Sequence, residues 1–300
     1  MYVLRLWPST MNNKNINKLI ENALAIEARD AKEAGALGYM GRALVQATMP
    51  HRKIEGNEFI RKNGSFTLTM LAPSHVGIPY GSMPRLLMAW ITTEAVKTGL
   101  QELVMGRSLS DFMRQLGLVP TGGRWGSITR LREQMIRIFS SSISCTYNDA
   151  SRASGVNMQV AEDYSLWWEP RKPEQAALWE STITLNRRFF DEITSSPIPI
   201  DIDALKALKK SPMALDIYCW LTYRMSYLKR NTGIPWQALA AQFGSNYAND
   251  AQGIRNFRRH FIEQLKKVNC VYPNANVECD ASALTLKPSK THIKSSIVKA

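Results

Sequence analysis

The feature that most constrains the fold of this chain is an order of helices and strands that occurs twice. Each copy contains an apolar helix, a short helix ending in Gly, a basic amphipathic helix and a β-rich stretch. The first copy reads PRLLMAWITTEAVKTG (from Pro84), SLSDFMRQLG (from Ser108), GRWGSITRLREQMIRIF (from Gly123) and SISCTYND (from Ser142). The second copy reads PMALDIYCWLTYRMSYL (from Pro212), PWQALAAQFG (from Pro235), AQGIRNFRRHFIEQLKKV (from Ala251) and NVECDASALTL (from Asn276). The shared order predicts two copies of one fold.

Helix, helix-turn-helix and hairpin follow each other in this order in the winged-helix fold, whose last helix enters the DNA major groove. We therefore expect an α+β protein, mainly α, with two tandem winged-helix domains and a helical N-terminal arm. The stretch WWEPRKPEQ, rich in proline and charge, predicts the domain boundary. The expected parts are an N-terminal extension and arm (1–57), a first domain (58–170), a second domain (171–287) and a basic, disordered tail (288–300).

Local signals predict further elements. Apolar residues spaced along one helical face from Ile16 predict the arm, either packed on its own domain or used for dimerisation, with a loop following through Pro50. The first ten residues are expected to be an extension outside the fold. The pair Asn63-Gly64 predicts a hairpin, because it accepts a positive φ. The second domain is expected to open with a strand STITLN, from Ser181, and a short helix from Arg187 to Ile193.

Composition restricts the partners of the chain. Its 38 Lys and Arg exceed 25 Asp and Glu, giving a net charge of +13, which implies a polyanion such as nucleic acid or a membrane surface. No apolar run reaches the ~20 residues that span a bilayer, so no membrane insertion is expected. The opening MYVLRLWPST lacks the features of a signal peptide. Four scattered cysteines without CxxC spacing favour reduced thiols and a cytoplasmic location.

The two basic helices carry the candidate binding residues. In the first, Ile128, Leu131, Met135 and Ile138 recur every three or four residues and should pack inward. In the second, inward positions are expected for Ile254, Phe257, Phe261 and Leu265. The side chains expected to contact DNA are Arg124, Trp125, Thr129, Arg130, Arg132, Arg137, Gln252, Arg255, Asn256, Arg258, Arg259 and Lys266, with Lys287 in the second wing. Lys290 and Lys294 in the tail would add non-specific attraction.

Each of these assignments has an alternative. A single basic helix face is usually just solvated, but two such helices at matching positions favour DNA binding. The tryptophans Trp167, Trp168, Trp179, Trp220 and Trp236 could stack on bases, although apolar neighbours favour core packing. Trp125 lies among glycines and arginine before the first basic helix, so contact with DNA and mere exposure are equally open.

Signals for catalysis are weak. The four histidines, His51, His75, His260 and His292, are isolated, and no metal-binding pair or GxxxxGK[ST] phosphate loop is present. Asp201 and Asp203 fit a helix cap better than a metal site. We therefore expect no catalytic residue, metal or cofactor, and no enzyme activity. The alternative within the enzymes is a strand-nicking initiator that uses Tyr147 or Tyr247.

Three stretches carry a resemblance to a known family: PYGSMPRLLMAWITTEAV (from Pro79), PTGGRWGSITRLREQM (from Pro120) and SPMALDIYCWLTYR (from Ser211). They resemble the plasmid-encoded RepA-type replication initiators of bacteria. The resemblance implies two winged-helix domains that bind direct repeats, or iterons, of double-stranded DNA at a plasmid origin. It further implies local opening, recruitment of host replication initiator and helicase proteins, and a homodimer that represses its own promoter for copy control. A repressor of that promoter alone is the alternative in a neighbouring class.

Overall fold

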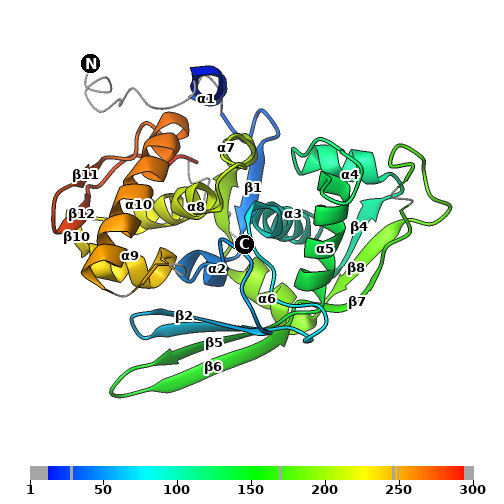
Figure 1. Cartoon of the computed structure of the whole chain (residues 1–300), viewed down its shortest axis with the longest axis horizontal. Helices are drawn as coiled ribbons and strands as arrows, with labels where there is room; N and C mark the ends of the chain where they lie inside the picture. Colours follow the sequence, from blue (N-terminus) through cyan, green and yellow to red (C-terminus); the bar gives the residue numbers. More distant parts are fainter. Residues whose placement is uncertain (1–12, 28–29, 169–170, 245–246, 249, 294–300) are drawn as a thin grey trace.

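The computed structural model describes residues 13–27, 30–168, 171–244, 247–248 and 250–293 of the chain. Helices and antiparallel sheets are mixed throughout, and the long helices α3 (Ser82–Thr98) and α8 (Pro212–Tyr227) pack against each other near the centre (Figure 1). Within the described residues, no helix is long and apolar enough to cross a membrane. The expected N-terminal extension and Lys294 lie outside the described residues.

The first repeat places three strands beside three helices. After α3 it comprises β4 (Glu102–Gly106), α4 (Leu109–Gln115), α5 (Ser127–Phe139), β7 (Ala161–Ser165) and β8 (Ser181–Leu185). The strands form an antiparallel sheet in the order β4-β8-β7. The helix α5 is the predicted first basic helix, and Ile128, Leu131, Met135 and Ile138 on it are buried as expected.

The second repeat has the same sequence of elements. After α8 it comprises β10 (Thr232–Pro235), α9 (Trp236–Phe243), α10 (Ala251–Val271), β11 (Val277–Cys279) and β12 (Ala283–Leu286). Its antiparallel sheet has the order β10-β12-β11, which matches the order β4-β8-β7 position by position. Phe257, Phe261 and Leu265 of α10 are buried, and Ile254 is half-buried.

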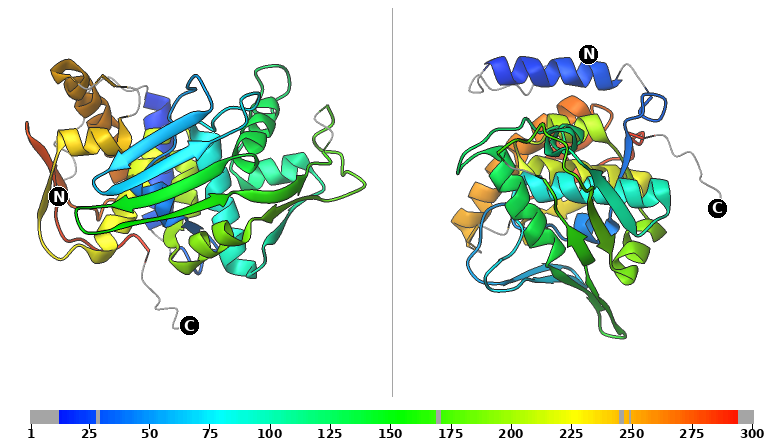
Figure 2. Two further views of the ribbon diagram at one scale, coloured as in Figure 1. Left: turned by 90° about the horizontal axis from the view of Figure 1, so that it is seen from below. Right: turned by 90° about the vertical axis from the view of Figure 1, so that its right-hand side faces the viewer.

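The stretch expected as the first wing belongs to a different sheet. SISCTYND forms β5 (Ser142–Asn148), which pairs with β3 (Phe66–Leu71) and β6 (Ala153–Gln159). The hairpin predicted at Asn63-Gly64 is confirmed: it joins β2 (Glu58–Asn63) to β3, with Gly64 at φ +61°. The four strands make a sheet in the order β2-β3-β5-β6 that covers one side of the helices (Figure 2, left). The prediction of a hairpin of the first repeat at SISCTYND was therefore wrong, because β5 and β6 belong to the four-stranded sheet and precede β7 and β8 in the chain.

Strand pairing crosses the expected boundary at residue 170. The strand β8, placed in the second domain by the sequence, pairs with β4 and β7 of the first. The helix α6 (Arg187–Ser195) also packs against α3, and both STITLN and the short helix after it form as predicted. The proline-rich stretch thus lies in the connection between the paired strands β7 and β8 rather than between separate sheets. Pro170 itself lies outside the described residues.

The N-terminal segment is part of the fold. The arm helix α1 (Asn13–Glu27) packs against α10 and α7 (Ile202–Ala207), crossing the molecule on one side (Figure 2, right). The loop expected through Pro50 was wrong, because the segment holds β1 (Leu37–Met40) and α2 (Arg42–Gln46). The strand β1 pairs with β9 (Ile198–Asp201), and Asp201 caps α7 by accepting hydrogen bonds from the amides of Asp203 and Ala204.

Part of the expected C-terminal tail is packed. The imidazole of His292 stacks on Tyr272 at 4.8 Å, and its Nδ1 lies 2.7 Å from the Tyr218 hydroxyl. The Tyr272 hydroxyl donates to the carbonyl of Lys290 at 2.8 Å. The expectation of disorder was therefore wrong for residues 288–293.

A buried ion pair joins the two repeats. Arg85 of α3 is 2% exposed, and its Nε and Nη2 donate to the two carboxylate oxygens of Asp216 on α8, both at 2.7 Å. His51 Nε2 lies 2.7 Å from the same carboxylate. Burial opposes ionisation of Asp216, but the attraction of Arg85 and the hydrogen bonds from His51 and Arg85 prevail and lower its pKa. The ion pair between Arg85 of α3 and Asp216 of α8 thus connects the two repeats.

Candidate nucleic-acid interface

The turn before α5 is closed by hydrogen bonds. Ser127 N donates to Thr121 Oγ1 and Thr121 N donates to Ser127 Oγ, each at 2.9 Å. Gly126, the N-cap of α5, has no room for a side chain, because a Cβ there would lie 2.2 Å from the Thr121 carbonyl oxygen. The sequence Gly-Gly-Arg-Trp-Gly therefore forms a compact turn that fixes the N-terminus of α5.

Five predicted residues of the first repeat are exposed around this turn and along α5: Arg124, Trp125, Thr129, Arg130 and Arg132. The guanidinium of Arg124 lies over the ring of Trp125, 5.1 Å from its centroid. Thr129 Oγ1 donates to the Gly123 carbonyl at 2.9 Å, which ties the helix to the turn. These side chains form one polar and cationic face at the N-terminal part of α5.

Arg137 does not belong to this face. It is 9% exposed and donates through Nη1 to the Ile78 carbonyl at 3.2 Å and through Nη2 to Glu133 at 2.8 Å. The expectation that it points outward was wrong, because the segment before α3 covers the C-terminal part of α5. Glu133, four residues before Arg137, was the sequence signal for an internal ion pair.

The helix α10 presents a second basic face. Asp250 caps it by accepting a hydrogen bond from Gly253 N at 2.6 Å, and a Cβ on Gly253 would lie 1.9 Å from the Ala248 carbonyl oxygen. Gln252, Arg255 and Arg259 are exposed along the first turns, and Asn256 is half-buried between them. Arg255 Nη2 donates to Gln252 Oε1 at 2.7 Å. The second basic helix thus also starts at a glycine packed against the preceding turn.

Other predicted residues of the second repeat are less available. Arg258 lies 5.7 Å from the ring centroid of Trp236 and donates to the Ala281 carbonyl at 3.3 Å, so it attaches α10 to the connection between β11 and β12. Lys266 is half-buried. Lys287 forms an ion pair with Glu278 across the β11–β12 hairpin. Of these three cations, Arg258 packs within the protein, through its contacts with Trp236 and the Ala281 carbonyl.

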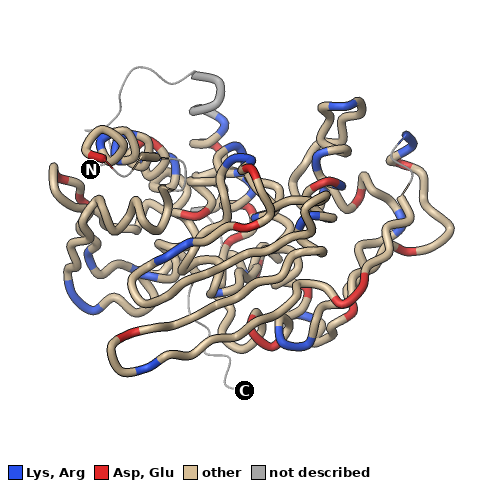
Figure 3. The backbone as a smooth tube through the Cα atoms, turned by 60° about the horizontal axis from the view of Figure 1, so that its bottom comes forward, with Lys and Arg blue, Asp and Glu red and all other residues tan. Residues whose placement is uncertain are grey.

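The hairpin of the first repeat is acidic and aromatic. Glu162 and Asp163 lie exposed on β7, along the acidic stretch seen there in Figure 3. Trp167 and Trp179, near the start and end of the β7–β8 connection, are 54% and 61% exposed. The expectation of core packing is confirmed for Trp220 and Trp236 and wrong for Trp167 and Trp179, while Trp168 is half-buried and stacks on Phe112 at 5.2 Å.

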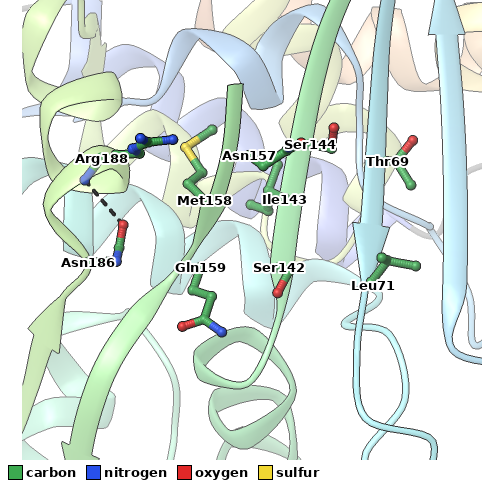
Figure 4. Close-up of a pocket in the computed structure, with 10 residues that line it drawn as sticks. All are labelled: Thr69, Leu71, Ser142, Ile143, Ser144, Asn157, Met158, Gln159, Asn186 and Arg188. Atoms are coloured by element: carbon green, nitrogen blue, oxygen red, sulfur yellow. Dashed lines mark hydrogen bonds between the residues drawn. The ribbon is translucent and has the colours of Figure 1, made fainter. Parts of the chain in front are cut away.

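A depression lined by both polar and apolar side chains lies on the outer face of the four-stranded sheet. It has a volume of about 430 Å³ and is open to solvent beside the start of α6 (Figure 4). Its polar lining residues come from β3, β5, β6 and α6: Thr69, Ser142, Ser144, Asn157, Gln159, Asn186 and Arg188. No carboxylate, imidazole or thiol lines it, so it offers polar and apolar contacts but no acid–base pair. No local sequence pattern predicts this depression, since its strands pair over long separations.

The groups considered for catalysis are dispersed. Among the described residues, no three His, Cys, Asp or Glu side chains are arranged to hold a metal ion. Tyr147 is 47% exposed on β5. Tyr247 packs edge-on against Phe257 at 5.5 Å, and burial raises the pKa of its phenol. Burial lowers the pKa of the neighbouring His260. Neither tyrosine therefore lies beside a metal site within the described residues.

Two solved structures share the fold of this chain. A crystal structure of RctB domains 2-3 has a TM-score of 0.50 and 12% sequence identity, covering 82% of this chain and 96% of the other. A second, of selenomethionine derivatives of RctB domains 2 and 3, has a TM-score of 0.53 and 11% identity, covering 85% and 97%. Identities this low show likeness of fold alone. No curated protein matches the sequence.

The family is shown by the sequence itself. Residues 78–238, more than half of the chain, match the family described as plasmid-encoded RepA protein. The chain therefore belongs to this family, and its membership supports a role as a replication initiator. The match includes α3, α5 and α8, the helices at the centre of both repeats.

Proposed function

We propose that this protein is a plasmid replication initiator that binds repeated double-stranded DNA sites at the origin. Two tandem winged-helix domains place α5 and α10 in neighbouring major grooves. The bound protein promotes local opening and recruits host replication initiator and helicase proteins. It acts in the bacterial cytoplasm without enzymatic activity, metal or cofactor, and a homodimer is a second state of the chain.

The observation that carries this proposal is the agreement between the two repeats. Both have the same strand order, and in both an exposed basic helix face follows a turn closed by a glycine. Five exposed arginines lie on these two faces: Arg124, Arg130, Arg132, Arg255 and Arg259. The family match adds a role in plasmid replication to this geometry.

Arginine suits such an interface chemically. Its planar guanidinium donates two parallel hydrogen bonds, to a phosphate or to the O6 and N7 atoms of guanine. If each repeat occupies one major groove on the same face of the duplex, the site spans roughly 20 bp. Bending of that duplex would favour melting at flexible A·T-rich steps nearby.

The test is nuclease footprinting of the full chain on DNA from its own replicon at two salt concentrations. Wild-type protein should protect regularly spaced repeats of about two helical turns, roughly 20 bp. Arg130→Ala/Arg132→Ala and Arg255→Ala/Arg259→Ala should each lose one half of this footprint. Each double variant should also reduce the slope of log affinity against log salt by about 2, one for each lost phosphate contact.

Arg187→Ala serves as the control, because Arg187 is 70% exposed and pairs with Asp191 on α6, which is neither of the two basic helices. Its footprint should equal that of the wild type. Protection of a single promoter palindrome would favour the repressor over the initiator. A footprint that stays whole in both double variants would exclude α5 and α10 from the interface.

The strand-nicking alternative is tested separately. Supercoiled origin DNA should stay supercoiled when incubated with the protein and Mg²⁺. Relaxation that Tyr147→Phe or Tyr247→Phe abolishes would make the protein an enzyme and overturn the non-enzymatic part of the proposal.

A further inference from the structure

Trp125 has an unusual exposure for its residue type. Its side chain is 78% exposed, more than that of any other tryptophan the structure describes. An exposed indole offers a partner a large apolar face together with an N–H donor. Trp125 lies directly before the N-cap of α5, at the end of the helix that we propose to enter the major groove.

The turn holds the backbone of Trp125 in a defined place. The amide of Gly126 donates to the Gly123 carbonyl at 3.0 Å, so the backbone closes around Arg124 and Trp125. The same carbonyl accepts from Thr129 Oγ1, and Thr121 and Ser127 exchange the hydrogen bonds described above. A preorganised turn loses little backbone freedom on binding, which favours affinity.

The arginine next to Trp125 adds a cation to the ring. Arg124 lies 5.1 Å from the ring centroid, in the geometry of a cation–π contact. An aromatic ring with an adjacent guanidinium matches a nucleobase and its phosphate, because the base offers a π-face and the phosphate a negative charge. The pair is therefore suited to one nucleotide at the edge of the α5 site.

The second repeat also has an aromatic residue in the turn before its basic helix, but this residue packs inward. Tyr247 lies three residues before the Asp250 cap and packs edge-on against Phe257 of α10 at 5.5 Å. Its amide donates to the Gly244 carbonyl at 3.0 Å. Only the turn of the first repeat, among the turns before the two described basic helices, offers an aromatic ring to a ligand.

We propose that Trp125 is a wedge that stacks on a nucleobase of the bound duplex and unstacks the base step beside the α5 half-site. This inference rests on the proposed function and adds a place where opening begins, at the first repeat rather than the second. Side chains that insert between base steps unstack them and kink the duplex. The ligand is a base of any identity, because every base has a π-face.

The experiment combines affinity with permanganate reactivity of thymines, which increases when a thymine is unstacked. The DNA carries the protected repeat, with a thymine placed in turn at each position of the α5 half. Full-length wild-type protein should make one step reactive at the edge of that half. Trp125→Ala should abolish this reactivity and weaken binding about tenfold or more, while Trp125→Phe retains most of both.

Two further measurements separate stacking from other roles. The salt slope of Trp125→Ala should equal that of the wild type, since no charge is removed. Trp179→Ala, which truncates another exposed tryptophan on the β7–β8 connection, should change neither reactivity nor affinity. Because Trp125 is exposed, Trp125→Ala should have the same melting temperature as the wild type. Measuring this temperature verifies that the variant is folded.

The outcomes are distinct. Reactivity and affinity that persist in Trp125→Ala would overturn the wedge while leaving DNA binding intact. A loss that appears equally in Trp179→Ala would overturn it too, because a general effect of surface tryptophans would then explain the data. Wild-type protein that protects no DNA would refute the proposed function and the wedge together.

Discussion

The two repeats share one order of elements and one strand order, yet they are built into the molecule differently. In the first, α5 has 13 residues and is followed by the inserted strands β5 and β6 and by an acidic hairpin. In the second, α10 has 21 residues and leads directly to the short hairpin β11–β12. A common topology therefore fixes where the basic helices lie, while the surrounding elements determine which of their cations are exposed.

Each repeat uses one arginine of its basic helix for packing. Arg137 at the end of α5 is buried beneath the segment before α3, and Arg258 in α10 holds the connection of the second hairpin. In α5 the exposed arginines lie nearer the N-terminus than Arg137, whereas in α10 the exposed Arg255 and Arg259 lie on either side of Arg258 in the sequence. A basic helical face therefore contains exposed cations that can bind a ligand and cations that pack, and tertiary neighbours determine which cations pack.

The largest expected effect is a loss of stability when the ion pair between the two repeats is removed. Asp216→Ala leaves Arg85 buried without its carboxylate partner, and loss of one partner of a buried pair costs about 3–5 kcal/mol. Urea unfolding followed by circular dichroism measures the change. Because the pair joins α3 to α8, we expect both repeats to unfold in one transition at lower urea.

A matched surface pair provides the control for this change. Asp191→Ala removes the partner of Arg187 in an exposed pair and should cost less than about 1 kcal/mol. Replacing both partners, as Arg85→Met/Asp216→Leu, should recover only part of the lost stability, because the carbonyls of Met49, Pro50 and Gly81 then lose the hydrogen bonds that Arg85 donates to them. A change of under 1 kcal/mol in Asp216→Ala would mean that the ion pair does not hold the repeats together.

The next effect compares the glycines that precede the basic helices. Gly126→Ala and Gly253→Ala each force a Cβ into a backbone carbonyl, at 2.2 Å and 1.9 Å in the unrelaxed geometry. Overpacking of this kind costs about 1–3 kcal/mol. We expect similar losses in the free energy of unfolding for the two variants, together with weaker binding through the affected helix.

Gly233→Ala is the control for the glycine pair, because a Cβ there would lie 4.0 Å from Thr285 Oγ1, an ordinary van der Waals distance. Its free energy of unfolding should remain close to that of the wild type. If Gly126→Ala and Gly253→Ala are tolerated as well as this control, the two turns adapt freely and do not position α5 and α10.

The pH dependence of stability should reveal the same junction between the repeats. Burial lowers the pKa of His51 below 6.5, an effect strengthened by the charges of Arg85 and Arg61 and only partly offset by Asp216. The unfolded chain then binds more protons than the folded one between the lowered pKa and 6.5. Stability should therefore fall as pH is lowered below 6.5, by at most about 1.4 kcal/mol per pH unit.

Unfolding measured from pH 7.5 to pH 5 tests this sign, with His51→Gln as the comparison. The variant has no group to titrate at this position, so its stability should vary less over the range. Asp216 contributes elsewhere: its lowered pKa makes its stabilisation disappear only below its ordinary range near pH 4. A His51→Gln curve parallel to that of the wild type would assign the pH dependence to other groups.

Local patterns predicted the elements well. Spacing of apolar residues located α5 and α10 with their inward sides, Asn63-Gly64 located a hairpin, and the carboxylate of Asp201 was correctly given to a helix cap. Each of these features depends on residues a few positions apart. Their physics is therefore visible in a short window of sequence.

Features that depend on distant partners could not be predicted in this way. The sheet that contains β5 is assembled from segments far apart in the chain, since Phe66 of β3 pairs with Tyr147 of β5. Trp167 and Trp179 have apolar sequence neighbours, which predicted core packing. They are exposed because they lie near the ends of the long β7–β8 connection. The exposed residues at the turn before α5 were identified because glycines surround Trp125, a local signal again.

The smallest expected effect concerns the hairpin of the second repeat. Lys287→Ala breaks an ion pair in which Glu278 is 63% exposed, so the free energy of unfolding should change by less than about 1 kcal/mol. If Lys287 also meets a phosphate, the salt slope should fall by about 1. Glu278→Gln provides the opposite change: it frees Lys287 from its partner, and binding to the repeat should become tighter. If Lys287→Ala changes neither the affinity nor the salt slope, the β11–β12 hairpin does not contact DNA and α10 is the contact of the second repeat. Both repeats would then bind DNA through their basic helices alone.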